Sequence, residues 1–271
     1  MSDERKKIER IWLTPAKGGV GVGFASVNLA LALCRRGKRV LLVDGSVFGR
    51  SLDTVLSCAE DVIYDIGDLA AHRVEMDKTL LRPLGENGPA LLPAAFSGED
   101  AVTGQALSTL LSELSDTGEF DYILVDALAL TDALVCAKTY DRVLVVTDPT
   151  PASLRSAEMR GVSLRGAAVA SVSLLINRFS LLPPRESGQD KAILMMDQAS
   201  LPLLGIIPTV GELSETAHKY VGKYPLLEGR AFRAEPALAA FDNLAGRLLG
   251  EEVPLLSNIR AVRSYRRKLL Y

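Results

Sequence analysis

The sequence predicts a single α/β domain, built on a doubly wound, mainly parallel sheet that is flanked by helices. Three observations lead to this fold class. Short apolar runs are continuous rather than alternating, which is typical of strands buried on both faces. Segments with apolar residues at three- and four-residue spacing lie between these runs and predict helices. A glycine-rich turn joins the first predicted strand to the first predicted helix.

Seven short apolar runs are the predicted strands, and most of them end in a polar or turn-forming residue. None reaches the roughly 18 uncharged apolar residues that a membrane-spanning helix needs. Because strands that alternate with helices are joined by right-handed crossovers, ligand sites are expected at the carboxyl ends of the strands. The runs cover residues 10–14, 38–44, 90–94, 121–126, 141–148, 171–178 and 203–208.

Helices, a loop and a tail complete the predicted organisation. The stretch LLPPRESGQD, residues 181–190, is predicted to be a surface loop because it is rich in proline and polar residues. We predict one domain over residues 1–252 and a distinct basic, amphipathic tail over residues 253–271. The segments with helical periodicity are residues 21–36, 105–114, 151–165 and 236–249.

Composition limits the class of protein. The 271 residues are 48% hydrophobic and 24% charged, which is enough for one large core. The net charge of −2 gives no reason to expect a specific nucleic-acid partner. Three widely spaced cysteines without a CxxC pair indicate neither a disulfide framework nor a zinc site, which favours a reducing cytosol. The first ten residues are charged rather than apolar, so no signal peptide is expected.

Histidine chemistry is not indicated. His72 and His218 are the only histidines, and neither lies at metal-ligand spacing or beside a candidate nucleophile in sequence. We expect both to be surface or boundary residues and no metal to be bound by histidine. A dinucleotide-binding enzyme is a further alternative, because GVGVG resembles part of the GxGxxG pattern, although Asp44 lies at the acidic position only by a generous count.

The stretch AKGGVGVGFAS, residues 16–26, has the context of a phosphate-binding loop between a strand and a helix. Glycines let backbone N–H groups turn inward, and a helix N-terminus adds the positive end of its dipole. The alternative is a tight strand-to-helix turn without a ligand.

This loop resembles that of the deviant Walker A ATPases, the MinD/ParA family of division-site and partition proteins, whose pattern is KGGxGK followed by Thr or Ser. Val22 replaces the phosphate lysine of the pattern, and Gly23 replaces the hydroxyl residue that binds magnesium. The resemblance implies that Lys17 is the signature lysine, which reaches across a dimer to the nucleotide of the partner. The matching residues are Lys17, Gly18, Gly19 and Gly21.

The resemblance covers nearly the whole chain, is strongest to the MinD branch and is interrupted mainly at residues 181–190. In LLVDGSVFGRSLD, Asp44 matches the family, while Ser46 replaces an aspartate that helps to position the attacking water. In FDYILVDALAL, Asp126 matches the Walker B position, but the proline-containing turn that usually follows is absent. Three further residues fall where the family contacts the base, namely Asn177, Arg178 and Pro208.

The substitutions at positions 22 and 23 predict weak nucleotide binding. A charge-assisted hydrogen bond contributes about 1.5–3 kcal/mol, so losing two or three removes roughly 3–9 kcal/mol. Micromolar affinity amounts to only about 8 kcal/mol. We therefore expect weak binding of ATP or ADP at most, no firmly held Mg²⁺, and loss of hydrolysis.

Compensation by Lys17 or Arg50 is the alternative to this loss. In that case Lys17, Asp44 and Asp126 are the expected catalytic residues, with Asp126 at the metal. Asp126 could instead be a strand-end carboxylate that caps the following turn.

The C-terminal tail predicts contact with an anionic membrane. Residues 253–271 contain five basic and no acidic side chains, so the tail carries +5 and the rest of the chain −7. Apolar residues recur at helical spacing beside the arginines, a pattern typical of a helix in a membrane interface. The MinD branch also ends in such a helix, whereas the alternative is a final helix packed on the body. The predicted membrane-contacting residues are Ile259, Arg260, Val262, Arg263, Arg266, Arg267, Lys268 and Leu269.

Three functional hypotheses follow from these observations. The first is a MinD-like pseudo-ATPase, a peripheral membrane or scaffold protein at the inner face of the cell membrane that acts in septum placement with a protein partner of the division machinery. The second is an active but atypical ATPase that dimerises with ATP. The third is a nucleotide-independent interaction protein in flagellar placement or DNA partition, as a homodimer or as a heterodimer with an active paralogue.

Overall fold

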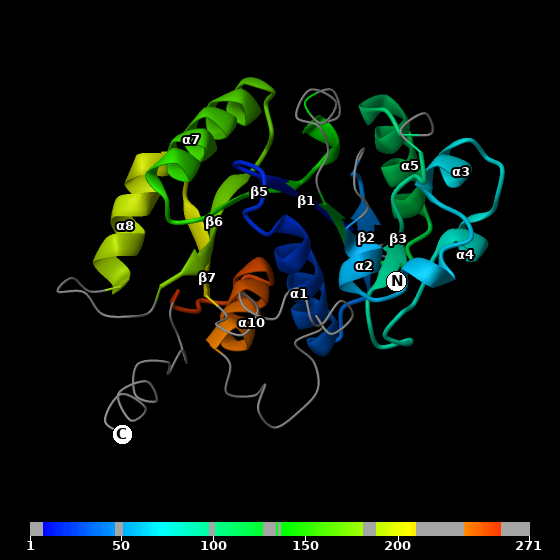
Figure 1. Ribbon diagram of the computed structural model, residues 1–271, viewed down its shortest axis with the longest axis horizontal. Coiled ribbons are helices and arrows are strands. Elements are labelled where there is room, and N and C mark those ends of the chain that lie inside the picture. The colour runs from blue at the N-terminus through cyan, green and yellow to red at the C-terminus, as the bar shows by residue number, and fades with distance from the viewer. Residues whose placement is uncertain are drawn as a thin grey trace, which may run out of the picture.

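The computed structural model describes residues 8–46, 51–97, 101–126, 134, 137–180, 188–209 and 236–255. Within these ranges seven strands form one sheet in the order β3-β2-β4-β1-β5-β6-β7, and every pairing between neighbouring strands is parallel (Figure 1). The predicted doubly wound α/β fold is therefore confirmed. The strands are β1 Glu9–Pro15, β2 Val40–Asp44, β3 Ala90–Leu92, β4 Tyr122–Asp126, β5 Arg142–Thr147, β6 Val172–Phe179 and β7 Leu203–Pro208.

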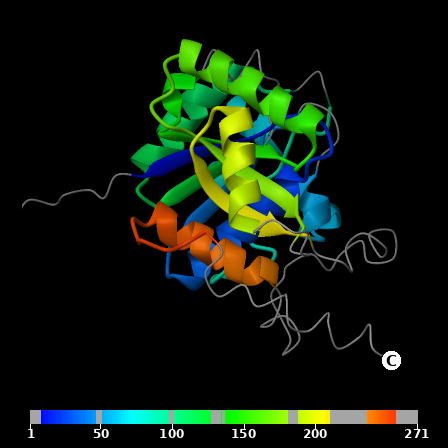
Figure 2. The ribbon, with the colours of Figure 1, turned by 90° about the vertical axis from the view of Figure 1, so that its left-hand side faces the viewer.

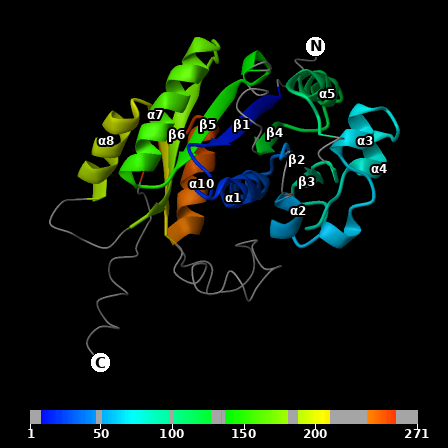
Figure 3. The same cartoon turned by 45° about the horizontal axis from the view of Figure 1, so that its top comes forward.

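Helices cover both faces of the sheet. Figure 2 shows α7 on one side of the sheet and α10 on the other, and Figure 3 shows α10 lying beside α1. The helices are α1 Val22–Arg35, α2 Leu52–Val55, α3 Ile66–Ala70, α4 Met76–Thr79, α5 Gly104–Asp116, α7 Pro151–Gly166, α8 Gly188–Ala199 and α10 Pro236–Leu248. Two short 3₁₀ turns are Ala59–Asp61 and Ala137–Thr139.

The core consists of two apolar layers, one on each face of the sheet. Successive strand residues point to opposite faces, so Leu124 belongs to the layer that includes α1 and α10, while Val125 belongs to the layer that includes α5, α7 and α8. Both side chains are fully buried. Burial on both faces is the reason why the strands read as continuous apolar runs rather than as alternating ones.

Most predicted elements are confirmed, and the loop prediction needs a correction. Residues 188–190 were predicted as part of a surface loop, but they form the first turn of α8. A glycine followed by polar residues gives a weak local helix signal, so tertiary packing of Ala192 and Ala199 decides the conformation. Residues 181–187 of that predicted loop lie outside the described residues. The helices α2 and α3 were not predicted because four or five residues are too few to show periodicity.

The chain turns back onto the body after α10. Arg247 donates from Nε to the Val253 carbonyl over 2.7 Å and from Nη1 to the Leu204 carbonyl over 3.0 Å. Leu255, the last described residue, packs against the core layer of α5, α7 and α8. Residues 256–271, and with them all the predicted membrane-contacting residues, lie outside the described part of the chain. Among the described helices, none is long and apolar enough to cross a bilayer.

Candidate functional site

The glycine-rich loop connects the central strand β1 to the helix α1. Ala16 donates its backbone N–H to the Val146 carbonyl over 2.8 Å, which continues the sheet one residue beyond the end of β1. Gly19 and Gly21 then adopt φ angles of 78° and 89°, in the left-handed region that favours glycine. Helix α1 begins at Val22 without a side-chain cap, so the amides of its first turn have no intrahelical acceptor. The loop therefore presents backbone donors toward the carboxyl edge of the sheet.

Asn177, near the end of β6, binds this loop through a hydrogen bond. The side chain of Asn177 is buried and donates from Nδ2 to the Val20 carbonyl over 2.8 Å. A Cβ atom at Gly21 would lie 2.6 Å from the same Nδ2 atom, so a side chain there would have to displace the amide of Asn177. The backbone N–H of Arg178 donates to Asn177 Oδ1 over 2.9 Å. The amide that was predicted to contact a base is thus engaged by the loop and by its own neighbour.

Arg178 and Pro208 lie at the ends of two neighbouring strands. Arg178 is exposed and has a φ angle of 55°, whereas Pro208 is the buried last residue of β7. Phe179 and Pro208 are partners in the parallel ladder of β6 and β7. The structure thus brings the three residues predicted at the base to one edge of the sheet.

Lys17 forms an intramolecular ion pair, although its side chain is partly exposed. Its Nζ atom lies 3.4 Å from Asp148 Oδ2 and donates to Thr150 Oγ1 over 3.2 Å. The hydroxyl and the backbone N–H of Thr150 in turn donate to Asp148 Oδ1, over 2.5 Å and 3.1 Å. Burial raises the pKa of Asp148, but the hydrogen bonds from Thr150 and the charge of Lys17 outweigh burial and hold this pKa below its ordinary value.

The neighbours of Gly23 define the place where the family has its magnesium-binding hydroxyl. A Cβ atom at Gly23 would lie 3.3 Å from Asp126 Oδ2, 3.4 Å from Ser51 Oγ and 3.5 Å from Leu52 Cδ2. A Cβ atom at position 23 would thus lie in tight contact with the carboxylate of Asp126 but would not overlap it. Gly23 itself supplies no hydroxyl group at this place.

Asp44 serves as an acceptor for the backbone that follows β2. Its Oδ1 accepts the N–H of Ser46 over 3.0 Å, and its Oδ2 accepts the N–H groups of Ser51 and Leu52, each over 3.0 Å. Asp44 is 1% exposed and lies beside Asp126 in the ladder of β2 and β4. The contacts of Asp44 are those of a carboxylate that shapes a loop and starts a helix.

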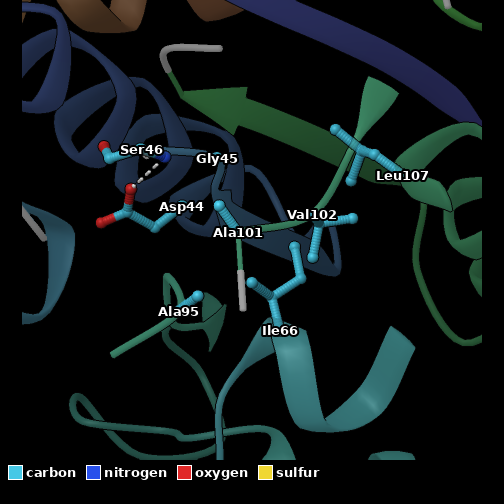
Figure 4. A pocket seen from close by; sticks show the side chains of 8 residues that line it. All are labelled: Asp44, Gly45, Ser46, Ile66, Ala95, Ala101, Val102 and Leu107. Atoms are coloured by element: carbon cyan, nitrogen blue, oxygen red, sulfur yellow. Dashed lines mark hydrogen bonds between the residues drawn. The ribbon is translucent and has the colours of Figure 1, made fainter. Parts of the chain in front are cut away.

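A small pocket lies beside Asp44 at the carboxyl edge of β2 (Figure 4). Asp44, Gly45 and Ser46 form its polar side, and the dashed line in Figure 4 marks the bond from the Ser46 N–H to Asp44. The remainder of the lining is apolar, namely Ile66, Ala95, Ala101, Val102 and Leu107. An apolar lining of this kind offers no cation to a phosphate group.

The loop lacks the lysine and the hydroxyl residue that the family pattern has at positions 22 and 23. The backbone cradle is present, but Val22 and Gly23 supply neither a cation nor a hydroxyl. The signature lysine is paired with Asp148. Among the residues that the structure describes, no group of three or more His, Cys, Asp or Glu side chains could hold a metal ion.

Other candidate chemistry is not supported by the described side chains. Burial raises the pKa of Cys34 to about 11, which leaves it a neutral thiol in the last turn of α1, packed against the core layer of α1 and α10. His72 is exposed, as predicted, whereas His218 lies outside the described residues.

The predictions from sequence missed Asp148, Thr150 and Ser51. Asp148 directly follows a buried strand, as Asp44 and Asp126 do, so the rule that polar residues at strand ends form the site could have found it. The contact of Ser51 with position 23 depends on how the loop after β2 folds back. No sequence signal indicated that contact.

A parallel sheet with a glycine-rich loop between its central strand and a helix defines the class of P-loop NTPase folds. Comparison with known proteins places the chain within this class. A family model described as "ParA: NUBPL iron-transfer P-loop NTPase" matches residues 7–224. The chain belongs to the MinD/ParA family, as its loop predicted.

Curated relatives and solved structures agree with this assignment. The septum site-determining protein MinD of Synechocystis sp. is 30% identical over 96% of this chain and 98% of its own length. MinD of Bacillus subtilis is 30% identical, over 91% of each chain. The MinC:MinD cell division protein complex of Aquifex aeolicus contains a chain with a TM-score of 0.76 and 27% identity, covering 91% of this chain and 98% of that one. MinD of Pyrococcus horikoshii, complexed with Mg-ADP, shares the fold with a TM-score of 0.69 at 24% identity over 89% of this chain and 96% of that one.

Proposed function

We propose that this protein is a MinD-like pseudo-ATPase that acts as a membrane-associated or scaffold protein in the spatial regulation of cell division. The relatives at 30% identity are septum site-determining proteins and match the chain almost from end to end, which supports a role in septum placement. A protein partner from the division machinery is expected, since one similar structure is a complex of MinD with MinC.

One observation carries the pseudo-ATPase part of the proposal. The loop keeps the backbone shape of a phosphate cradle, but valine and glycine occupy the two positions that supply charge and metal in the family. The side chains nearest to a Cβ atom at position 23 are Asp126, Ser51 and Leu52, and none of them is a cation. Water positioning is weakened as well, because Ser46 cannot act as the carboxylate of the family.

Calorimetry with MgATP, combined with a phosphate-release assay, tests this proposal on the full-length protein. We expect the wild type to bind MgATP with a dissociation constant of about 1 mM or higher. We also expect it to release no phosphate above background. The variant Val22→Lys/Gly23→Thr restores both lost groups and should bind MgATP at least about tenfold more tightly. Gly166→Ala, at the C-terminal end of α7 and away from the loop, is a control, because a Cβ atom there meets nothing within 4 Å.

The outcome also separates the alternative functions. Turnover of ATP by the wild type that disappears in Lys17→Ala would establish an active, atypical ATPase and overturn the proposal. A nucleotide-dependent change from monomer to dimer in light scattering would support the same alternative. A partner captured equally well with and without ATP would favour nucleotide-independent binding.

A further inference from the structure

The loop retains one cation, and the fold places a carboxylate beside it. Lys17 is the one Lys or Arg among residues 16–23, and its side chain is 39% exposed. Asp148 Oδ2 lies 3.4 Å from Lys17 Nζ, and the Asp148 side chain is 12% exposed. An approaching phosphate group would therefore meet a lysine whose charge is already compensated by an internal anion.

The carboxylate of Asp148 is held in place from several directions. Thr150 donates twice to its Oδ1 atom, which leaves Oδ2 for the lysine. The backbone N–H of Asp148 donates to Ser153 Oγ over 3.4 Å, in the first turn of α7. Thr150 precedes α7 but makes no side-chain cap with it, since its hydroxyl is used by Asp148 and Lys17. The ion pair is thus part of the junction between β5 and α7 and not a chance contact of two flexible side chains.

We propose that Asp148 is a positioning residue that holds Lys17 in an intramolecular ion pair and thereby lowers the affinity of the loop for phosphate anions. This inference rests on the proposed function, because it concerns the regulation of the same loop. A ligand of the polyphosphate class must separate Lys17 from Asp148 or bind beside a negative charge. Removing the charge of Asp148 frees the lysine without changing the glycine cradle.

Titration calorimetry of the full-length protein with inorganic pyrophosphate, in the absence of Mg²⁺, tests the inference. Asp148→Asn keeps the shape of the side chain and an acceptor for Thr150, and we expect pyrophosphate to bind it about tenfold more tightly than the wild type. Asp148→Asn/Lys17→Gln should lose the whole gain, because the gain acts through the lysine. Asp141→Asn, at the other end of β5, removes the same charge away from the loop and should leave the affinity unchanged.

The possible outcomes decide the matter. Unchanged affinity in Asp148→Asn, or a gain that persists without Lys17, would overturn the role of Asp148. If Asp148→Asn does not fold, Thr150→Val provides a second test, because it removes the hydroxyl that contacts both Lys17 and Asp148. We expect this variant to bind pyrophosphate about threefold more tightly than the wild type. No gain in Thr150→Val would count against the inference. Hydrolysis of MgATP by the wild type would overturn the proposed function while leaving the pyrophosphate comparison intact, so the two failures are distinguishable.

Discussion

Gly21 is the residue whose neighbours restrict the loop most tightly. Its φ angle of 89° lies in the left-handed region, and the amide of Asn177 occupies the space that a side chain would need. The same amide donates to the Val20 carbonyl. The left-handed conformation of Gly21 and the hydrogen bond of Asn177 therefore depend on one another. A single glycine thus allows the end of β6 to hold the turn after β1.

The first residue-scale prediction concerns that glycine. Gly21→Ala should lower the free energy of unfolding by about 1–3 kcal/mol, because the methyl group requires a strained φ and displaces Asn177. Urea unfolding followed by circular dichroism measures the change. Gly18→Ala is the matched control and should differ from the wild type by less than about 1 kcal/mol. Equal stability of the two variants would show that Asn177 does not constrain the loop.

The second residue-scale prediction concerns pH. The folded-state pKa of Asp148 is lowered, so its stabilisation is present above the unfolded pKa of about 3.9 and is lost as pH falls through the folded value. The wild type should therefore be more stable than Asp148→Asn at neutral pH by about 1 kcal/mol. This difference should shrink on acidification below about pH 4. Urea unfolding of both proteins over a pH series measures it, and a difference that does not vary with pH would contradict the lowered pKa.

At the scale of elements, the segment between β2 and α2 is organised by one carboxylate. Asp44 accepts three backbone N–H groups and is almost fully buried, so it both ends the strand and starts the helix. Ser51 and Leu52, which lie near Gly23, are held by these bonds. The position of α2 next to the loop therefore depends on Asp44.

Replacing Asp44 tests this dependence. Asp44→Ala leaves buried N–H groups without their acceptor and should lower the free energy of unfolding by about 2–4 kcal/mol. Asp44→Asn keeps one side-chain oxygen as an acceptor, so it should lower the free energy of unfolding by less than Asp44→Ala does. Amide hydrogen exchange should show the largest loss of protection at Ser51 and Leu52. A uniform change over the whole chain would argue against a local role for Asp44.

At the scale of the whole molecule, the sheet and its two helical layers form a body onto which the chain returns at Leu255. The basic segment that follows is the part for which we predict contact with an anionic membrane. Its net charge of +5 contrasts with −7 for the rest of the chain, so we expect attraction to anionic lipid at this end. Membrane binding and folding should therefore be separable.

Deleting residues 256–271 tests that separation. We expect the shortened protein to keep the circular dichroism spectrum and melting temperature of the full chain, but to lose cosedimentation with vesicles that contain phosphatidylglycerol. Reversing charge by Arg266→Glu/Arg267→Glu/Lys268→Glu should abolish vesicle binding as well, because each basic residue contributes about 1 kcal/mol near an anionic surface. Unfolding on deletion would support a tail helix packed on the body.

The family and the fold were determined by the sequence alone. Continuous apolar runs and helical periodicity are local patterns, and they predicted the order of strands and helices correctly because each strand is buried on both faces. The identities of Val22 and Gly23 are read directly from the sequence. The expected loss of a charge and of a metal ligand follows from them without a structure. Short elements such as α2 lacked enough residues for a periodic signal.

The tertiary structure decided which side chains meet. The ion pair of Lys17 with Asp148, the bond of Asn177 to the Val20 carbonyl and the three bonds of Asp44 connect segments or turns whose contact cannot be read from residue types. Lys17 and Thr150 are 133 positions apart, and they meet because β1 and β5 are neighbours in a parallel sheet. Strand order and register set these distances. The physical reason is that the carboxyl ends of parallel strands converge at one edge only when the sheet has assembled.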